Sequence, residues 1–125
     1  MGVWVHQYIP NGYFFTGTYT DKEMGARRIR YDWSLLNDFD RVLKEIRFQG
    51  LYFVAVDNPG DGFPHVHAIV QDSENVQRLG PRWGVTRGGY KIELAGGPAY
   101  FYAAKYAVRT NQFGDSRYRE NFKPN

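Results

Sequence analysis

Two apolar runs joined by a short loop constrain the fold of this 125-residue chain more than any other feature. LYFVAVD (51–57) and HVHAIVQD (65–72) are rich in β-branched and aromatic residues, which is typical of strands. The segment between them, NPGDGFP, contains proline and two glycines, so it is predicted to be a loop. The two runs therefore predict an antiparallel hairpin.

The rest of the chain alternates strand and helix patterns around this hairpin. Beyond the two hairpin strands, the predicted elements are a strand at 12–20, an amphipathic helix at about 34–48, a short helix at 73–79 capped by Ser73 and ended by the turn Gly80–Gly84, a strand at 88–95, and a helix at 99–111 with Pro98 near its first turn. This order favours an α+β fold, with a central antiparallel sheet and helices packed mainly on one of its faces. We expect residues 1–125 to form a single domain, with a mobile polar tail at about 112–125.

The second hairpin strand begins with two histidines, His65 and His67. Successive side chains of a strand point to opposite faces, so these two share one face. If they were structural, both imidazoles would have to be hydrogen-bonded or exposed, and metal ligation is the better explanation. A pair of structural histidines remains the alternative.

A metal on two histidines needs a further oxygen or nitrogen ligand, because the chain has no cysteine. We expect this ligand to be Asp57, which ends the partner strand and can face the histidines across the ladder. Asp61 in the loop and Gln71 beyond the strand are competing candidates, and His6 is a weaker one.

Tyr102 and Tyr106 are four residues apart on the last predicted helix, so both hydroxyls can address one site. Lys105 and Arg109 each follow a tyrosine by three residues, which places a cation beside each phenol. Such a cation favours the phenolate or holds a phosphate. The alternative is that the tyrosines are a packed stripe of the core, as we expect for Tyr100.

Positive charge is concentrated toward the C-terminus. Residues 1–77 carry 7 Lys and Arg against 10 Asp and Glu, a balance of −3, whereas residues 78–125 carry 9 against 3, a balance of +6. Arginine forks suit phosphate and aromatic rings stack on bases, so we expect a nucleic-acid partner, with Arg82 and Arg87 on its backbone. The alternative is a solvated basic surface, and for Trp83 a structural role is the favoured interpretation.

Taken together, these features resemble the HUH endonucleases, in particular the replication initiators of rolling-circle phages and plasmids. The motifs that carry the resemblance are the strand FFTGTYT (14–20) with Thr16 and Thr18, the HVH of residues 65–67, and YAAKYAVR (102–109), a doubled Y-x-x-K with Arg109 in place of the final lysine. Their order and spacing agree with the family pattern, over most of the chain.

The resemblance implies an enzyme that nicks single-stranded DNA at a replication origin, which can include a hairpin. Family members carry the histidines on a middle strand under the tyrosine helix and bind Mg²⁺ or Mn²⁺ through them and a third polar residue. A tyrosine attacks the scissile phosphate, leaving a 5′-phosphotyrosine and a free 3′-hydroxyl, and a later attack by a 3′-hydroxyl reseals the strand. The residues implied are Tyr102 as first nucleophile with Lys105, Tyr106 as second nucleophile, His65, His67 and Asp57 at the metal, and Arg109, Thr16 and Thr18 at the DNA.

The same resemblance implies a cytoplasmic protein of a cell that hosts a phage or plasmid, with a host helicase and polymerase as further partners. No window approaches the ~18 apolar residues that span a bilayer, and the N-terminus lacks the pattern of a secretory signal, so no membrane partner is expected. Three alternatives stay open: an HUH transposase or relaxase, a non-catalytic module that binds single strands by stacking, and a non-haem Fe(II) oxygenase. The last also uses two histidines and a carboxylate but has no use for the tyrosine pair.

Overall fold

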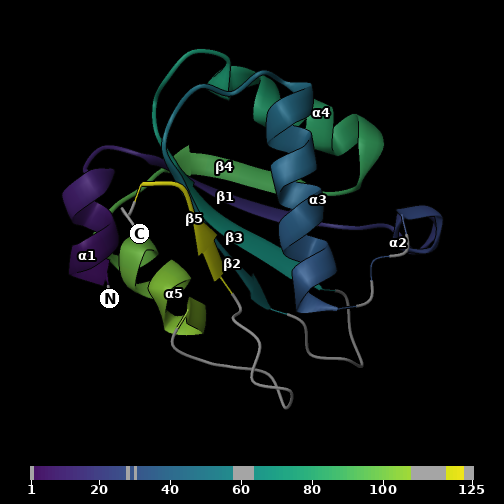
Figure 1. Ribbon diagram of the computed structural model, residues 1–125, viewed down its shortest axis with the longest axis horizontal. Coiled ribbons are helices and arrows are strands. Elements are labelled where there is room, and N and C mark those ends of the chain that lie inside the picture. Colours follow the sequence, from purple (N-terminus) through teal and green to yellow (C-terminus); the bar gives the residue numbers. More distant parts are fainter. Residues whose placement is uncertain (1, 28, 30, 58–63, 108–117, 123–125) are drawn as a thin grey trace.

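The computed structural model describes residues 2–27, 29, 31–57, 64–107 and 118–122, which build one five-stranded antiparallel sheet with helices on both faces (Figure 1). The strands are β1 (Tyr13–Thr18), β2 (Tyr52–Asp57), β3 (His65–Val70), β4 (Tyr90–Leu94) and β5 (Tyr118–Glu120). The helices are α1 (Gly2–Tyr8), α2 (Asp21–Arg27), α3 (Asp32–Glu45), α4 (Leu79–Thr86) and α5 (Gly97–Ala107), with a 3-10 turn η1 (Val76–Arg78) before α4. None of these helices, within the described residues, is long and apolar enough to cross a membrane.

The predicted hairpin of β2 and β3 is confirmed and lies at the centre of the sheet. The strand order is β4-β1-β3-β2-β5, so β3 is the middle strand and pairs with β1 on one side and β2 on the other. The α+β class with a central antiparallel sheet is therefore confirmed as well.

The helices cover both faces of the sheet, so the expectation that they pack mainly on one face is wrong. Val54 of β2 points into the core under α3 and α4, while its neighbour Phe53 points into a second cluster under α1 and α5; neither side chain is exposed. A strand buried on both faces carries a continuous apolar run instead of an alternating pattern. LYFVAVD is such a run, and α1, α3, α4 and α5 supply the two layers (Figure 1).

Two short helices, α1 and α2, were not predicted. Helix α2 does carry a local signal, because the Thr20 hydroxyl accepts a hydrogen bond from the backbone N–H of Glu23 (3.2 Å). That contact is the first half of a capping box, T-x-x-E. Helix α1 has no comparable signal; Val5 and Ile9 bury themselves against Tyr100 of α5, so its formation depends on tertiary packing.

The turn Gly80–Gly84 does not end a helix, as the sequence predicted, but lies inside α4. Pro81 is the third residue of α4, in the first turn, where a missing N–H costs nothing. Gly80 and Gly84 leave room for the ring of Tyr90: a Cβ at Gly80 would lie 2.5 Å from that ring. Ser73, the predicted cap of the helix at 73–79, does not cap the 3-10 turn η1, since its hydroxyl donates to the carbonyl of Gln71 (3.3 Å).

The C-terminal segment contributes a strand where the sequence predicted a mobile tail. β5 pairs with β2, with Phe53 opposite Glu120 and Ala55 opposite Tyr118. Asn121 then holds the start of β2, because its side-chain oxygen accepts a hydrogen bond from the N–H of Tyr52 (2.8 Å). Residues 112–117 and 123–125 of the predicted tail lie outside the described part of the chain.

Candidate functional site

The two histidines of the middle strand lie at the centre of the candidate site. His65 and His67 share the face of β3 that α5 covers, with ring centroids 6.1 Å apart. His67 is buried and His65 is half-buried. Within the described residues, the Nδ1 atom of His65 is buried and has no hydrogen-bond partner. A buried imidazole nitrogen in this state is open to a ligand such as a metal ion.

Thr16 of β1 lies beside His67, as the cross-strand register requires. The two residues are directly paired, and Thr16 Oγ1 and His67 Nδ1 are 3.4 Å apart, a long hydrogen bond. Metal-binding histidines usually use one ring nitrogen for such an outer contact and the other for the metal. This contact therefore assigns Nε2 of His67 as the nitrogen that would ligate a metal.

The imidazole of His67 is neutral near pH 7. Burial lowers the pKa of His67 to about 4, the neighbouring His65 acts in the same direction, and the carboxylate of Asp57 opposes both. A neutral imidazole is the form that binds metal ions.

Asp57 lies where the hairpin register predicts, directly opposite His65 at the end of β2. Directly opposed residues have side chains on the same face, so its carboxylate belongs to the side of the sheet that carries the histidines. The described residues nevertheless contain no group of three His, Asp or Glu side chains close enough to hold a metal. The two imidazoles thus have the chemistry of metal ligands, whereas Asp57 shares their face without completing a three-ligand group in the described residues.

Two of the competing third ligands, Gln71 and His6, have other partners in the described structure. The side-chain oxygen of Gln71 accepts a hydrogen bond from the N–H of Leu51 (2.8 Å), which joins the strand ends. His6 of α1 meets Tyr100 edge-on, with centroids 5.1 Å apart. Asp61 lies outside the described residues.

Helix α5 brings Tyr102 to His67. Their rings meet edge-on at 87°, with centroids 5.0 Å apart, and Tyr102 is 44% exposed. Phe14 of β1 contacts both, at 6.1 Å from His67 and 6.0 Å from Tyr102. His67 and Tyr102, two predicted site residues 35 positions apart in the sequence, are thus in contact, and Tyr102 remains partly accessible to solvent.

Phe14 is a residue of the site that the sequence interpretation missed. It belongs to the aromatic strand FFTGTYT, and its spacing from Thr16 places both on the face of the histidines. The alternating side-chain directions of that strand, combined with its pairing to β3, could have identified Phe14 from the sequence.

Tyr100 anchors α5, and its predicted packing role is confirmed. It is 2% exposed, its hydroxyl donates to the carbonyl of Ile9, and it accepts a hydrogen bond from the N–H of Gly12 (3.2 Å). Residues 100 and 102 are about 200° apart around a helix, so one tyrosine fixes the helix while the other lies along the sheet toward the histidines.

The other tyrosine-helix residues are described only in part. Lys105 lies in α5 and is exposed. Tyr106 also belongs to α5, but its side chain is outside the described residues, as is Arg109 as a whole. The predicted roles of Tyr106 and Arg109 stay predictions.

The two predicted backbone-binding arginines differ sharply in exposure. Arg82 has a side chain 46% exposed, with Nε donating to Glu45 (3.1 Å), so it can still reach a ligand. Arg87 is 1% exposed and donates two hydrogen bonds to the buried carboxylate of Asp38 (2.8 and 2.9 Å). The assignment of Arg87 to DNA contact is therefore wrong, because its guanidinium is used inside the core.

Trp83 and Thr18 both make hydrogen bonds that connect β1 to the segment around α4 and β4. Trp83 is fully buried and its Nε1 donates to the carbonyl of Thr18 (2.9 Å), in keeping with the structural role favoured for it. The Thr18 hydroxyl donates to the carbonyl of Gly89 (3.2 Å), so it joins β1 to the loop before β4. Its role at DNA stays a prediction.

No family model, curated protein or solved structure matches this chain in the comparisons with known proteins.

Proposed function

We propose that this protein is a metal-dependent endonuclease and strand transferase that cuts single-stranded DNA through a tyrosine and begins rolling-circle replication at an origin. The observation that carries the proposal is the contact between Tyr102 and His67. A phenol beside a neutral, buried imidazole and its neighbouring histidine is the arrangement that this chemistry needs: a nucleophile within reach of a phosphate bound at the histidines.

In this proposal Tyr102 is the nucleophile. Its oxygen forms a bond to phosphorus while the bond from phosphorus to the 3′-oxygen breaks, so the proton lost by the phenol is balanced by one gained at the 3′-hydroxyl. Lys105, one turn further along α5, contributes positive charge that favours the phenolate or the phosphate. Tyr106 is the candidate for a second cleavage while the first DNA end is still attached.

His65 and His67 are the residues that would hold Mg²⁺ or Mn²⁺, with Asp57 as the proposed third ligand. When bound, such an ion withdraws charge from the non-bridging oxygens of the scissile phosphate. Thr16 fixes the ring of His67, and Phe14 packs against both His67 and Tyr102. The partner is single-stranded DNA, with host helicase and polymerase acting on the nicked product.

The test is a nicking assay on end-labelled single-stranded oligonucleotides with a randomised centre. The protein should form a covalent DNA adduct, visible on a denaturing gel, in Mn²⁺ or Mg²⁺ but not in EDTA, and Tyr102→Phe should form none. An adduct of undiminished yield in EDTA would end the metal assignment. Tight binding of single strands without any adduct would favour the non-catalytic binding module instead.

A further inference from the structure

The outer edge of β4 is free within the described part of the chain. β4 is the first strand of the sheet order and pairs only with β1 among the described strands. Its side chains are well exposed: 45% for Tyr90, 76% for Leu94, and 73% and 57% for the side chains of Lys91 and Glu93. An exposed edge with apolar side chains is a template for pairing with another strand.

The direction of the free backbone groups follows from the contacts with β1. Ala95 N–H donates to the carbonyl of Gly12 (2.9 Å), and the carbonyl of Gly89 accepts from Thr18 (2.9 Å), so the odd-numbered residues point their backbone groups at β1. Because these directions alternate along a strand, the N–H and C=O groups of Tyr90, Ile92 and Leu94 point outward.

The five residues of β4, YKIEL, are complementary to themselves when a second copy runs antiparallel. With Ile92 opposite the partner's Ile92, Tyr90 lies opposite the partner's Leu94, and all of these residues have outward backbone groups that can exchange hydrogen bonds. Lys91 then lies opposite the partner's Glu93 in a non-hydrogen-bonded pair, where side chains approach most closely. A single two-fold axis through the Ile92 pair therefore allows the backbone hydrogen bonds, the Lys91–Glu93 charge pairs and the apolar contacts to form at the same time.

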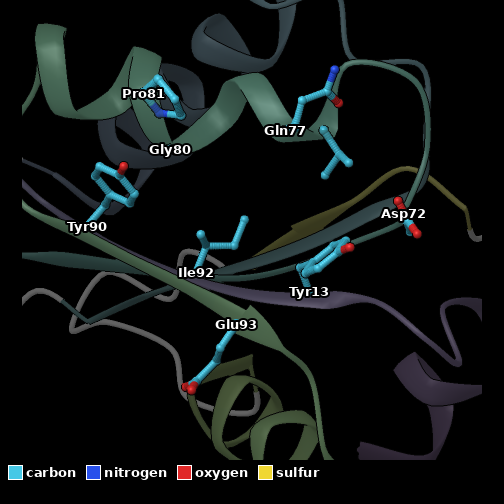
Figure 2. A pocket seen from close by; sticks show the side chains of 9 residues that line it. Tyr13, Asp72, Gln77, Gly80, Pro81, Tyr90, Ile92 and Glu93 are labelled. Atoms are coloured by element: carbon cyan, nitrogen blue, oxygen red, sulfur yellow. The ribbon is translucent and has the colours of Figure 1, made fainter.

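A pocket beside the same edge supports this arrangement. Its volume is about 350 Å³; Tyr90 and Ile92 line it from β4, and Gly80 and Pro81 from α4 (Figure 2). In the antiparallel pairing, the partner's Leu94 lies next to Tyr90 on this face of the sheet, and the partner's Ile92 lies next to Ile92. Apolar side chains of the partner would therefore cover the open side of an apolar pocket.

We propose that two copies of this chain associate through antiparallel pairing of their β4 edges, centred on Ile92, to form one continuous sheet across the dimer. A single edge strand and the pocket rim make an interface of roughly 1,200 Å² or less, which is the small end for specific association. The dimer is accordingly expected to be weak and to depend on protein concentration. The proposal is independent of the nuclease activity.

Sedimentation velocity on the full chain without DNA measures the association. Wild type should shift from monomer to dimer as the concentration rises, and Leu94→Pro should remain monomeric because it removes an outward N–H while the bonds to β1 stay intact. Leu94→Val, which keeps that N–H, is the matched control and should still dimerise. Wild type that is monomeric up to high micromolar concentration, or Leu94→Pro that dimerises like wild type, would overturn the proposal.

Charge exchange tests the register. Lys91→Glu and Glu93→Lys should each weaken self-association at least tenfold, because like charges then oppose each other. An equimolar mixture of these two variants should recover the dimer, since each supplies the charges that the other lacks, and so should the double variant. Single variants that dimerise like wild type, or a mixture that stays monomeric, would rule out this pairing.

Discussion

The phenol ring of Tyr102 meets the imidazole of His67 edge-on, with 5.0 Å between ring centroids. One residue lies on α5 and the other on the middle strand, so the contact depends on how the helix docks on the sheet. Tyr100 fixes that docking through its buried hydroxyl. The contact with His67 distinguishes Tyr102 from Tyr100, which is buried in the packing of α5, and makes Tyr102 the candidate nucleophile.

Tyr102→Phe should abolish the covalent adduct, a loss of several orders of magnitude, while the melting temperature stays close to that of wild type. The reason is that phenylalanine keeps the ring contact with His67 and removes only the nucleophilic oxygen. Tyr106→Phe should retain the first cleavage. Peptide mass mapping of the adduct identifies the tyrosine; an adduct on Tyr106 that persists at full yield in Tyr102→Phe would reverse the assignment.

Asp57→Ala should weaken Mn²⁺ binding at least about tenfold, measured by calorimetry on the protein without DNA, because it removes the carboxylate opposite His65. Gln71→Ala is the matched control: its side chain supports Leu51 instead of facing the histidines, so it should lower stability and leave Mn²⁺ affinity unchanged. Normal binding by Asp57→Ala together with lost binding in Asp61→Ala or Gln71→Ala would show that the ligand assignment is wrong.

Thr16→Val should weaken Mn²⁺ binding about 10–100-fold, the usual effect of losing an outer-sphere partner of a ligating histidine. Valine has nearly the shape of threonine but lacks the hydroxyl beside Nδ1 of His67. Thr16→Ser keeps that hydroxyl and should restore most of the affinity. Equal metal affinity in the valine and serine variants would remove Thr16 from the site.

Arg82→Gln should weaken binding to all single-stranded sequences alike and reduce the slope of log affinity against log salt by about 0.7 if one phosphate contact is lost. Its side chain is 46% exposed and, among the described residues, its guanidinium pairs with the partly exposed carboxylate of Glu45, so it can exchange this partner for a phosphate. Binding of labelled oligonucleotides over a salt series measures the slope. An unchanged slope would mean that Arg82 is a solvated surface residue that makes no contact with a phosphate.

Local patterns predicted the centre of the site well. The hairpin, the shared face of the histidines and the pairing of Asp57 with His65 all follow from the two-residue period of a strand, which requires no knowledge of the rest of the fold. The contact of Tyr102 with His67 was predicted by resemblance alone, because helix docking depends on residues such as Tyr100 and Ile9 that carry no local signal.

Long-range contacts account for the errors. Arg87 was assigned to the surface because it lies in a basic segment, yet its partner Asp38 is 49 residues away and draws it into the core. β5 is polar and short, and it becomes a strand only because the edge of β2 is there to pair with it. The failure to predict helix α2 has a different cause, since its T-x-x-E capping motif, Thr20 to Glu23, is a local signal that was visible in the sequence.

Arg87→Leu should lower the free energy of unfolding by about 3–5 kcal/mol, because it leaves the fully buried carboxylate of Asp38 without its bidentate partner. Arg41 also pairs with Asp38 (3.1 Å), but its side chain is 55% exposed, so Arg41→Leu should cost less than about 1 kcal/mol. Urea unfolding measures both. Equal losses in the two variants would contradict the central role of the buried pair.

The buried carboxylate of Asp38 also makes the free energy of unfolding depend on pH. Burial alone would raise the pKa of Asp38, but the hydrogen bonds from Arg87 and Tyr19 and the charges of Arg87 and Arg27 outweigh burial and hold its pKa below the ordinary value. A lowered folded-state pKa contributes stability that is complete above the unfolded value of about 3.9 and is lost as the pH falls through the folded value. The difference in unfolding free energy between wild type and Asp38→Asn should therefore be constant from about pH 5 to about pH 7, because Asp38 is ionised in both the folded and the unfolded state over this range. Below about pH 4 the difference should shrink. A difference that grows on acidification would mean that folding raises the pKa of Asp38 instead of lowering it, which would contradict the bidentate ion pair with Arg87.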